Sequence, residues 1–392
     1  MRSRRQLINS LLLVVLAGCT LMISACSTST SDVRITNTPI ASIAGKPASF
    51  DVIEIDQVNH RLYVADRADQ GIDLFDISSP SAQYLQTIAL PSSPNGLAIA
   101  QDLSRLYVGT ATGSVVLVDI NPASPTRYTV VQEVTTGGKS ADLLDYGAAR
   151  HEVYASNGVE GTVTSIDART GSVKAQFALG FALEQPRFNP ADGMLYVTSP
   201  DADAMFQVDP NDGKIKNKFG LGGCQPYGLA ISPQSLALIA CRDSVLTWDL
   251  KTGNSVKYHQ VTGGDVVTYS SKVGRFFVAS PHKTGPGAVG TFGGNPMDYM
   301  SSVAVANGGN SSAYDETNDV VYTPDISTDK AGLASFGLSE SGSFVLPSPS
   351  TLGLFGALLL VIVVLVIAVG RSADPARRVP MTPDEAWVRQ RR

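Results

Sequence analysis

The chain has 392 residues, enough for two or three average domains, or for one large repeat domain with smaller segments at its ends. Charged residues make up 17% of it, below the usual share of about 25%, and the mean hydropathy is +0.07, which points to membrane segments attached to a polar body. With 36 glycines, 22 prolines and 4 cysteines, the composition suits a turn-rich β protein and excludes a disulfide-dense miniprotein, a coiled coil and a wholly disordered chain. The net charge is −5, and since arginines are concentrated at both ends, the central part is more acidic still and a poor partner for nucleic acid.

Residues 1–26 have the pattern of a bacterial export signal. Three arginines precede an uncharged stretch at 6–25, in which the apolar run 11–16 is short for a spanning helix. Two tetrapeptides, ending in Cys19 and Cys26, resemble the bacterial lipobox, in which the cysteine becomes acylated. We favour lipidation of Cys26, because the serines and threonines of residues 27–32 would form a flexible tether. Cys19, which is closer to the lipobox consensus, is the alternative, as is an ordinary signal peptide with incidental cysteines.

A hydrophobic tetrapeptide, often with tyrosine in second place, recurs along residues 33–338 at spacings of 38 to 47 residues. The seven copies begin at Leu62, Leu106, Val153, Leu195, Leu238, Phe276 and Val321. A shorter apolar run precedes each copy, and a third run that ends in aspartate follows the first five. Four short strands per repeat predict an all-β fold, a seven-bladed β-propeller.

The last repeat has no fourth strand of its own before the linker at residues 339–349. Residues 33–43, ahead of the first repeat, end like the outer strands of the other repeats. We therefore expect this N-terminal strand to close the ring by completing the last blade, which leaves no open sheet edge.

The tetrapeptides Leu62-Tyr63-Val64-Ala65 and Leu195-Tyr196-Val197-Thr198 resemble the YVTN-type β-propeller repeat, which is WD40-like. The resemblance covers residues 33–338 and implies a propeller. It does not select a function, because similar propellers include lactonases, haem enzymes and pure binding modules. Residues 283–296 depart most from the repeat and are expected to be an irregular, glycine-rich insertion, either a contact surface or a degenerate part of blade six.

One set of polar residues stands eleven positions before each tetrapeptide, where the innermost strand of each blade begins. Its members are Asp51, Asn95, Asp142, Glu184, Tyr227, Asp265 and Asn310. Together they predict an oxygen-rich ring at one mouth of the central channel, suited to a hard cation such as Ca²⁺. The resemblance to propeller lactonases implies that such a metal would activate water. The alternative is a solvated channel mouth without a ligand.

The cysteines and histidines give few further signals. Cys224 and Cys241 both fall in blade five, within reach of each other, so an exported domain could bridge them; two buried thiols are the alternative. No two of the four histidines have metal-ligand spacing, and the chain has no haem-attachment motif, nucleophile elbow or phosphate loop.

Residues 350–370 have the length and composition of a transmembrane helix. Eighteen consecutive uncharged residues run from Leu352 to Val369, and the arginines of the following tail, residues 371–392, place that tail in the cytoplasm. Residues 347–352 resemble the start of a PEP-CTERM sorting signal, although Ser348 stands where that family has glutamate. The propeller is therefore expected on the periplasmic side of the cell membrane.

The sequence favours a non-enzymatic, membrane-anchored module that binds an envelope protein or a small ligand, since no catalytic set is recognisable in it. The alternative is a lactonase-like hydrolase with a metal, Ca²⁺ being the candidate, at the acidic channel mouth.

Overall fold

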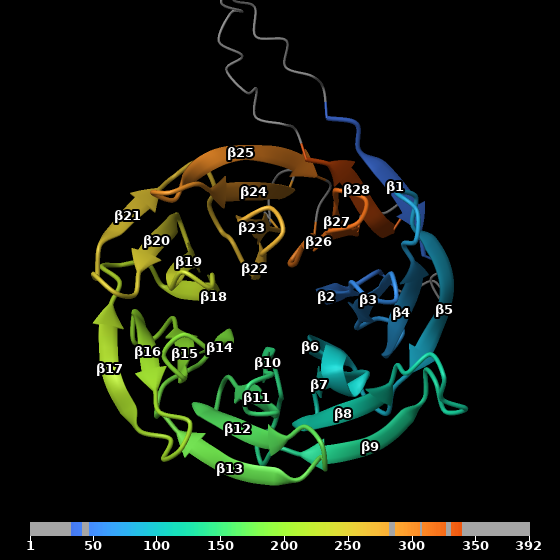
Figure 1. The fold of residues 1–392 in the computed structure, drawn as a ribbon, viewed down its shortest axis with the longest axis horizontal. Coiled ribbons are helices and arrows are strands. Elements are labelled where there is room, and N and C mark those ends of the chain that lie inside the picture. The colour runs from blue at the N-terminus through green and yellow to red at the C-terminus, as the bar shows by residue number, and fades with distance from the viewer. Residues whose placement is uncertain (1–32, 41–46, 282–286, 306–307, 327–330, 339–392) are drawn as a thin grey trace, which may run out of the picture. The chain divides into compact units, whose positions relative to one another are not determined.

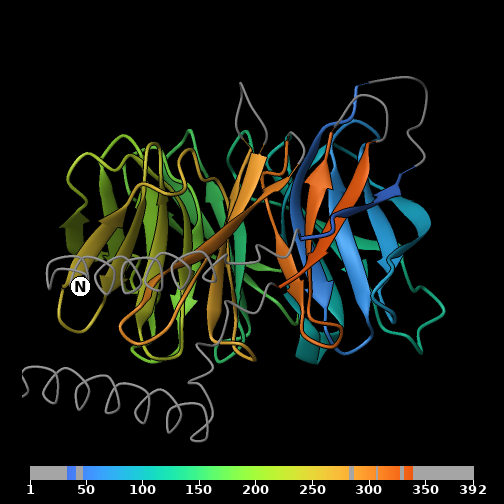
Figure 2. The same cartoon turned by 90° about the horizontal axis from the view of Figure 1, so that it is seen from above.

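A computed structural model describes residues 33–40, 47–281, 287–305, 308–326 and 331–338. Their strands form seven antiparallel sheets of four strands each, arranged in a ring around a central axis (Figure 1). Viewed from the side, the strands cross the thickness of the ring (Figure 2). The fold is a seven-bladed β-propeller, as the repeat predicted.

Each of the first six blades begins at the axis and winds outward through four consecutive strands. Blades one to three consist of β2 (Phe50–Asp56), β3 (Arg61–Asp66), β4 (Gly71–Asp76) and β5 (Gln83–Ala89); β6 (Pro94–Ala100), β7 (Arg105–Thr110), β8 (Ser114–Asp119) and β9 (Val130–Thr135); and β10 (Leu144–Gly147), β11 (Glu152–Asn157), β12 (Thr162–Asp167) and β13 (Val173–Ala178). Blades four to six consist of β14 (Pro186–Asn189), β15 (Met194–Ser199), β16 (Ala204–Val208) and β17 (Ile215–Gly220); β18 (Pro226–Ile231), β19 (Leu236–Cys241), β20 (Val245–Asp249) and β21 (Ser255–Tyr258); and β22 (Val267–Ser270), β23 (Arg275–Ser280), β24 (Gly287–Gly293) and β25 (Asp298–Val305). Blade seven contains β26 (Ala313–Asp315), β27 (Val320–Asp325) and β28 (Gly332–Gly337) together with β1 (Thr36–Pro39), and a short 3₁₀ helix, η1 (Gln101–Leu103), follows β6.

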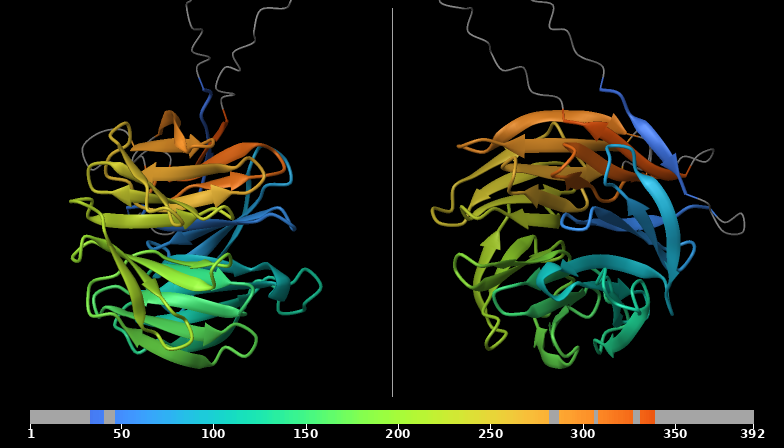
Figure 3. Two further views of the ribbon diagram at one scale, coloured as in Figure 1. Left: turned by 60° about the vertical axis from the view of Figure 1, so that its left-hand side comes forward. Right: turned by 45° about the vertical axis from the view of Figure 1, so that its right-hand side comes forward.

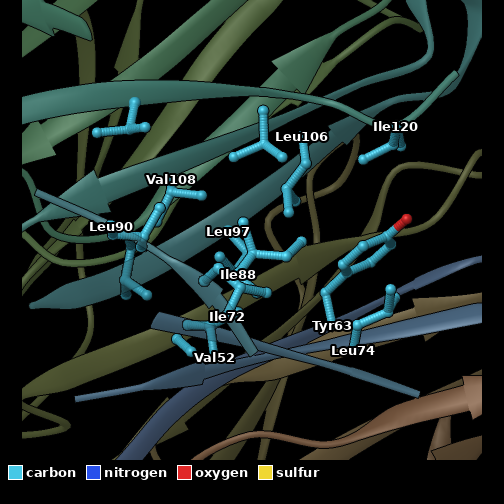
Figure 4. Packing of buried hydrophobic residues seen from close by; sticks show 14 of the residues in the cluster. Val52, Tyr63, Ile72, Leu74, Ile88, Leu90, Leu97, Leu106, Val108 and Ile120 are labelled. Carbon is cyan, nitrogen blue, oxygen red and sulfur yellow. The ribbon is translucent and has the colours of Figure 1, made fainter. Parts of the chain in front are cut away.

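All seven tetrapeptides lie in the second strand of their blade, which is almost wholly buried. The tyrosines in second place are among the largest fully buried side chains of the protein. They fill the space between neighbouring blades: Tyr63 and Leu74 of blade one pack in one cluster with Leu97 and Leu106 of blade two (Figure 4). The repeat is therefore visible in the sequence because each blade needs the same large side chain to pack on the next.

The N-terminal strand closes the ring. β1 pairs antiparallel with β28, with Thr36 opposite Ser335 and Pro39 opposite Gly332, so that blade seven has the order β1-β28-β27-β26. Figure 3 shows this strand, in blue, alongside the last strands of the ring. The predicted closure is confirmed; β1 begins at Thr36, three residues later than expected, and residues 41–43 of the expected range lie outside the described residues.

The expectation of an irregular insertion at residues 283–296 is wrong for residues 287–293, and residues 283–286 lie outside the described part of the chain. Residues 287–293 form β24, which pairs along its whole length with β23 and β25. Several glycines hide this strand, because glycine carries no side chain that could show the alternation of a strand. One of them is required by packing, since a Cβ at Gly290 would collide with the side chain of Val261.

Cys224 and Cys241 are joined by a disulfide, the bridged form of the two alternatives. Cys224 precedes β18 and Cys241 ends β19, and both are fully buried. The bond ties the chain segment that enters blade five to the second strand of that blade. Both cysteines belong to a core cluster with Tyr196 and Met205, which indicates a structural role.

Replacing both cysteines by serine is expected to lower the free energy of unfolding by about 3 kcal/mol, because the bond closes a short loop, with a sequence separation of 17, in the unfolded chain. Urea unfolding of the full-length chain in mild detergent, with and without a reductant, measures this change. Equal stability of the oxidised protein, the reduced protein and the serine variant would show that the bond contributes nothing.

The membrane features expected from the sequence lie outside the described residues. These are the export signal, both lipidation candidates, the tether, the linker, the apolar segment 350–370 and the basic tail. Within the part of the chain that the structure describes, no helix is long and apolar enough to cross a membrane.

Candidate functional site at the channel mouth

The seven predicted polar residues gather at one end of the central channel, which we call the acidic mouth. Each lies within the first two residues of its innermost strand or two to three residues before it. Successive innermost strands contact one another around the axis, as the central ring of strands in Figure 1 shows. Backbone hydrogen bonds join neighbouring members, because Gly96 N donates to Asp142 O at 2.9 Å and Val266 N donates to Asn310 O at 3.0 Å.

Two glycines let neighbouring blades approach closely at the acidic mouth. A Cβ at Gly96 would collide with the carbonyl oxygen of Asp142, and a Cβ at Gly228 would collide with that of Asp265. Neither glycine has a positive φ, so close approach, rather than an unusual backbone conformation, is the reason for glycine here. The tight contact fixes the backbone from which two of the mouth carboxylates project.

Arg67 also belongs to the acidic mouth, although the sequence did not indicate it. It lies in the loop after β3, and its guanidinium forms an ion pair with Asp51 and donates to Asn95 Oδ1 at 3.2 Å. Its backbone is held on both sides, because Arg67 N donates to Ser49 O at 2.8 Å and Arg67 O accepts from Ser93 Oγ at 3.2 Å. No other blade carries a basic residue at this place in the repeat, so alignment of the repeats could not find it.

The remaining members differ in what they contribute. Asn95 is buried and donates to Ala141 O at 3.0 Å, which fixes its side chain between two blades. Tyr227 and Asn310 take part through their backbone, since their carbonyl oxygens accept hydrogen bonds from Thr198 Oγ1 and Val266 N. The acidic mouth is therefore defined chemically by four carboxyl groups and one guanidinium.

The four carboxyl groups lie close enough to repel one another. Burial, followed by repulsion from Asp142, Asp265 and Asp51, raises the pKa of Glu184 to about 8. Burial also raises the pKa of Asp265 to about 6, with Asp142 as the next cause, and raises the pKa of Asp142. Burial raises the pKa of Asp51 to about 8 against the attraction of Arg67. One guanidinium does not balance four carboxyl groups, so the mouth holds protons or attracts a cation.

The acidic mouth was predicted from the sequence as a possible site for a metal ion. Among the described residues, no three His, Cys, Asp or Glu side chains are grouped closely enough to hold a metal ion. At the acidic mouth, Arg67 already donates to the oxygens of Asp51 and Asn95. Ca²⁺ takes six to eight oxygen ligands, and Arg67 occupies oxygens of two of the residues that were expected to supply them.

A second group of charged residues lies farther along the same inner strands and was missed by the sequence analysis. Glu54, Asp145 and Arg187 each follow a mouth residue by three positions. They line two adjacent lobes of a cavity, of about 300 and 280 Å³. The signal was present in the sequence, eight residues before three of the tetrapeptides, but alanines occupy the corresponding positions in blades two, five and seven.

Comparison with known proteins identifies the architecture. No family model matches the chain, and no curated protein matches it in sequence. Among solved structures, a chain of the "Crystal Structure of Mitotic Checkpoint Complex" is similar with a TM-score of 0.61 and 15% sequence identity, over 78% of this chain and 91% of that chain. At this identity the likeness shows the fold alone, the seven-bladed propeller. As many as 1676 chains match, so the architecture is too widespread to select one function.

Proposed function

We propose that the protein is a membrane-anchored, extracytoplasmic binding module, not an enzyme, whose acidic mouth receives a positively charged group of an envelope protein or small ligand. One observation carries this proposal: the fold brings four carboxyl groups, from four different blades, to one end of the channel with a single guanidinium among them. A propeller is a rigid support for such a surface, because every blade is held by its neighbours.

The chemistry of the mouth favours a ligand with an ammonium or guanidinium group. Glu184 forms no ion pair with any described residue, and burial together with three neighbouring carboxyl groups raises its pKa. A cationic side chain of a partner would form charge-assisted hydrogen bonds with such carboxylates and relieve their mutual repulsion. The acidic mouth would then select its partner mainly by charge and by the fit of one side chain into the channel.

The proposed location is supported by the sequence. The export signal and a lipobox cysteine, Cys26 or Cys19, would attach the N-terminus to the membrane, and the apolar segment 350–370 would attach the C-terminus. The resemblance to YVTN-type repeats and to a PEP-CTERM segment agrees with an exported bacterial protein. Both ends of the propeller leave from blade seven, so both anchors could enter one membrane.

A variant with Asp142→Asn and Asp265→Asn is expected to lose the partner while the ring stays folded. Crosslinking in intact membranes, followed by gentle solubilisation, should recover a specific complex with the full-length protein, and at least about tenfold less of it with the double variant, since each lost charge pair costs about 1 to 3 kcal/mol. Asp201→Asn, an exposed carboxylate in the loop between β15 and β16, is the matched control and should keep the complex. A complex that survives in the double variant would place the binding surface elsewhere.

A lactonase-like hydrolase is the second candidate. Neighbouring carboxyl groups with a pKa of about 8 for Glu184 and about 6 for Asp265 could act as general acid and general base near neutral pH. This candidate predicts that Asp142→Asn or Asp265→Asn abolishes turnover of a lactone without unfolding the ring. Full turnover in both single variants would end it.

A further inference from the structure

The cavity beyond the acidic mouth is a separate site with its own chemistry. Its two lobes share Glu54, Asp145, Tyr146 and Arg187. The rest of the lining comes from the innermost strands or the adjoining turns of blades one to six, so the cavity surrounds the axis of the ring. It lies farther along the channel than the acidic mouth, because its residues follow the mouth residues along the inner strands.

Alternation of small and charged residues creates the space. Ala98 and Ala230 line the cavity at positions where blades one, three and four carry Glu54, Asp145 and Arg187. A methyl group takes up less of the space between the inner strands than these longer side chains do. The apolar part of the wall adds Ile55, Ile99 and Ile231 to these alanines. The cavity therefore combines a charged group of side chains with a smaller apolar part of the wall.

The guanidinium of Arg187 already has hydrogen-bond and ion-pair partners within the protein. Its Nη1 donates to Leu144 O and Pro186 O, each at 3.2 Å, and lies 3.5 Å from Asp145 Oδ1. Its Nη2 donates to Val267 O of blade six at 3.3 Å, so the guanidinium crosses the channel between blades. Because the guanidinium of Arg187 already interacts with four oxygen atoms of the protein, it is expected to bind an anion only weakly.

Glu54 is the group that lacks a partner. Asp145 is held by Arg187 and by Phe188 N, which donates to Asp145 Oδ2 at 2.7 Å. By contrast, none of the described residues donates a hydrogen bond to the carboxyl group of Glu54 or forms an ion pair with it. Burial raises the pKa of Glu54 to about 7; Arg187 lowers it and Asp145 raises it. When Glu54 is ionised, the three charged side chains carry one net negative charge.

We propose that this cavity binds a small organic monocation, a primary amine with a short carbon chain, through an ion pair between its ammonium group and Glu54. The ammonium has three donors, for which Glu54 offers free oxygens, while the rings of Tyr146 and Tyr269 line the same cavity. The phenol oxygen of Tyr146 is already bonded to Asp102 and His151. The carbon chain packs on the isoleucines of the wall. One monocation neutralises the site, whereas a dication or an anion leaves it charged.

Calorimetric titration of the full-length protein in mild detergent with propylamine tests this proposal. Binding is expected in the millimolar range at about pH 8, where Glu54 is ionised and the amine is still protonated. At about pH 5.5, where Glu54 holds its proton, the affinity should fall at least about fivefold. Inorganic phosphate and acetate should neither bind nor compete.

The matched variant is Glu54→Gln, which keeps the shape and removes the charge. It should bind propylamine at least about tenfold more weakly than the unaltered protein. The double variant Asp142→Asn, Asp265→Asn at the acidic mouth should bind propylamine unchanged within about twofold, which separates this site from the proposed function. If Glu54→Gln does not fold, the propylamine titrations of the unaltered protein at the two pH values test whether Glu54 binds the amine. No binding of propylamine, equal affinity in folded Glu54→Gln, an affinity that is the same at both pH values, or binding of phosphate in its place would overturn the proposal.

Discussion

Gly332→Ala is expected to destabilise the protein by about 2 to 3 kcal/mol, the effect of overpacking a close contact, whereas Gly337→Ala should change stability by no more than about 0.5 kcal/mol. Both glycines lie in β28, and neither has a positive φ. A Cβ at Gly332 would collide with Thr38 O and would lie 2.7 Å from Asn37 Oδ1 and 3.0 Å from Pro39 Cα, all atoms of β1. A Cβ at Gly337 meets no atom within 4 Å.

The pair of variants therefore measures the closure of the ring. Urea unfolding of both full-length variants beside the unaltered protein gives the difference in the free energy of unfolding. If both glycines tolerate alanine equally well, β1 does not complete blade seven in solution. A protein with an undocked β1 would also present the unpaired edge of β28, which favours association between molecules.

The second large effect concerns pH, because stability is expected to fall as the pH rises from about 5 to about 8.5. Burial raises the pKa of Asp51 and Glu184 to about 8 and that of Glu54 to about 7. A group whose pKa is higher in the folded state stabilises the protein below its unfolded pKa of about 4 and loses this contribution as the pH rises through the folded pKa. Each unit of elevation corresponds to about 1.4 kcal/mol, so the total loss should reach several kcal/mol.

Asp73 is the best position at which to test this. It is fully buried in β4, next to the buried Asp66; burial raises its pKa, Thr87 lowers it, and Asp66 raises it. Asp73→Asn removes the acid and keeps the shape, so it should increase stability at high pH and make the pH dependence less steep. Asp212→Asn is the control, since its fully exposed carboxylate has a lowered pKa and does not titrate in this range.

Unfolding free energies of the unaltered protein and the two variants at a series of pH values measure this effect. The carboxylates with lowered pKa values lose their contribution only at more acidic pH, so they do not obscure the slope. A free energy of unfolding that stays constant or rises between about pH 5 and pH 8.5 would contradict the raised pKa values of the buried acids.

The repeat made the architecture predictable. Tyr63 and its equivalents occupy the same buried position between neighbouring blades. The same packing requirement in each blade explains why the tetrapeptide recurs in the sequence. Alignment on this tetrapeptide also found the residues of the acidic mouth, because the chain reaches the mouth of the channel eleven residues before the tetrapeptide in every blade. Strand β24 escaped notice because glycines such as Gly290 replace the side chains that would show its alternation.

What the sequence could not reveal depends on contacts between blades. Arg67 stands at a position of the repeat where no other blade has a basic residue, and only the close approach of blades one and two shows that it meets Asp51 and Asn95. The pairing of Asp66 and Asp73 depends on the register of β3 and β4, in which Asp66 is opposite Gly71 and Val64 is opposite Asp73. Glu54, by contrast, could have been found by reading the same alignment three residues farther.

The most direct test of the proposed function is the affinity of the full-length protein for a lysine-rich peptide, measured by calorimetry at several salt concentrations. The acidic mouth predicts binding that weakens as salt increases, and at least about tenfold weaker binding by the double variant Asp142→Asn, Asp265→Asn than by Asp201→Asn. Equal affinity of the two variants for the peptide, or affinity that does not depend on salt, would contradict the acidic mouth as the binding surface.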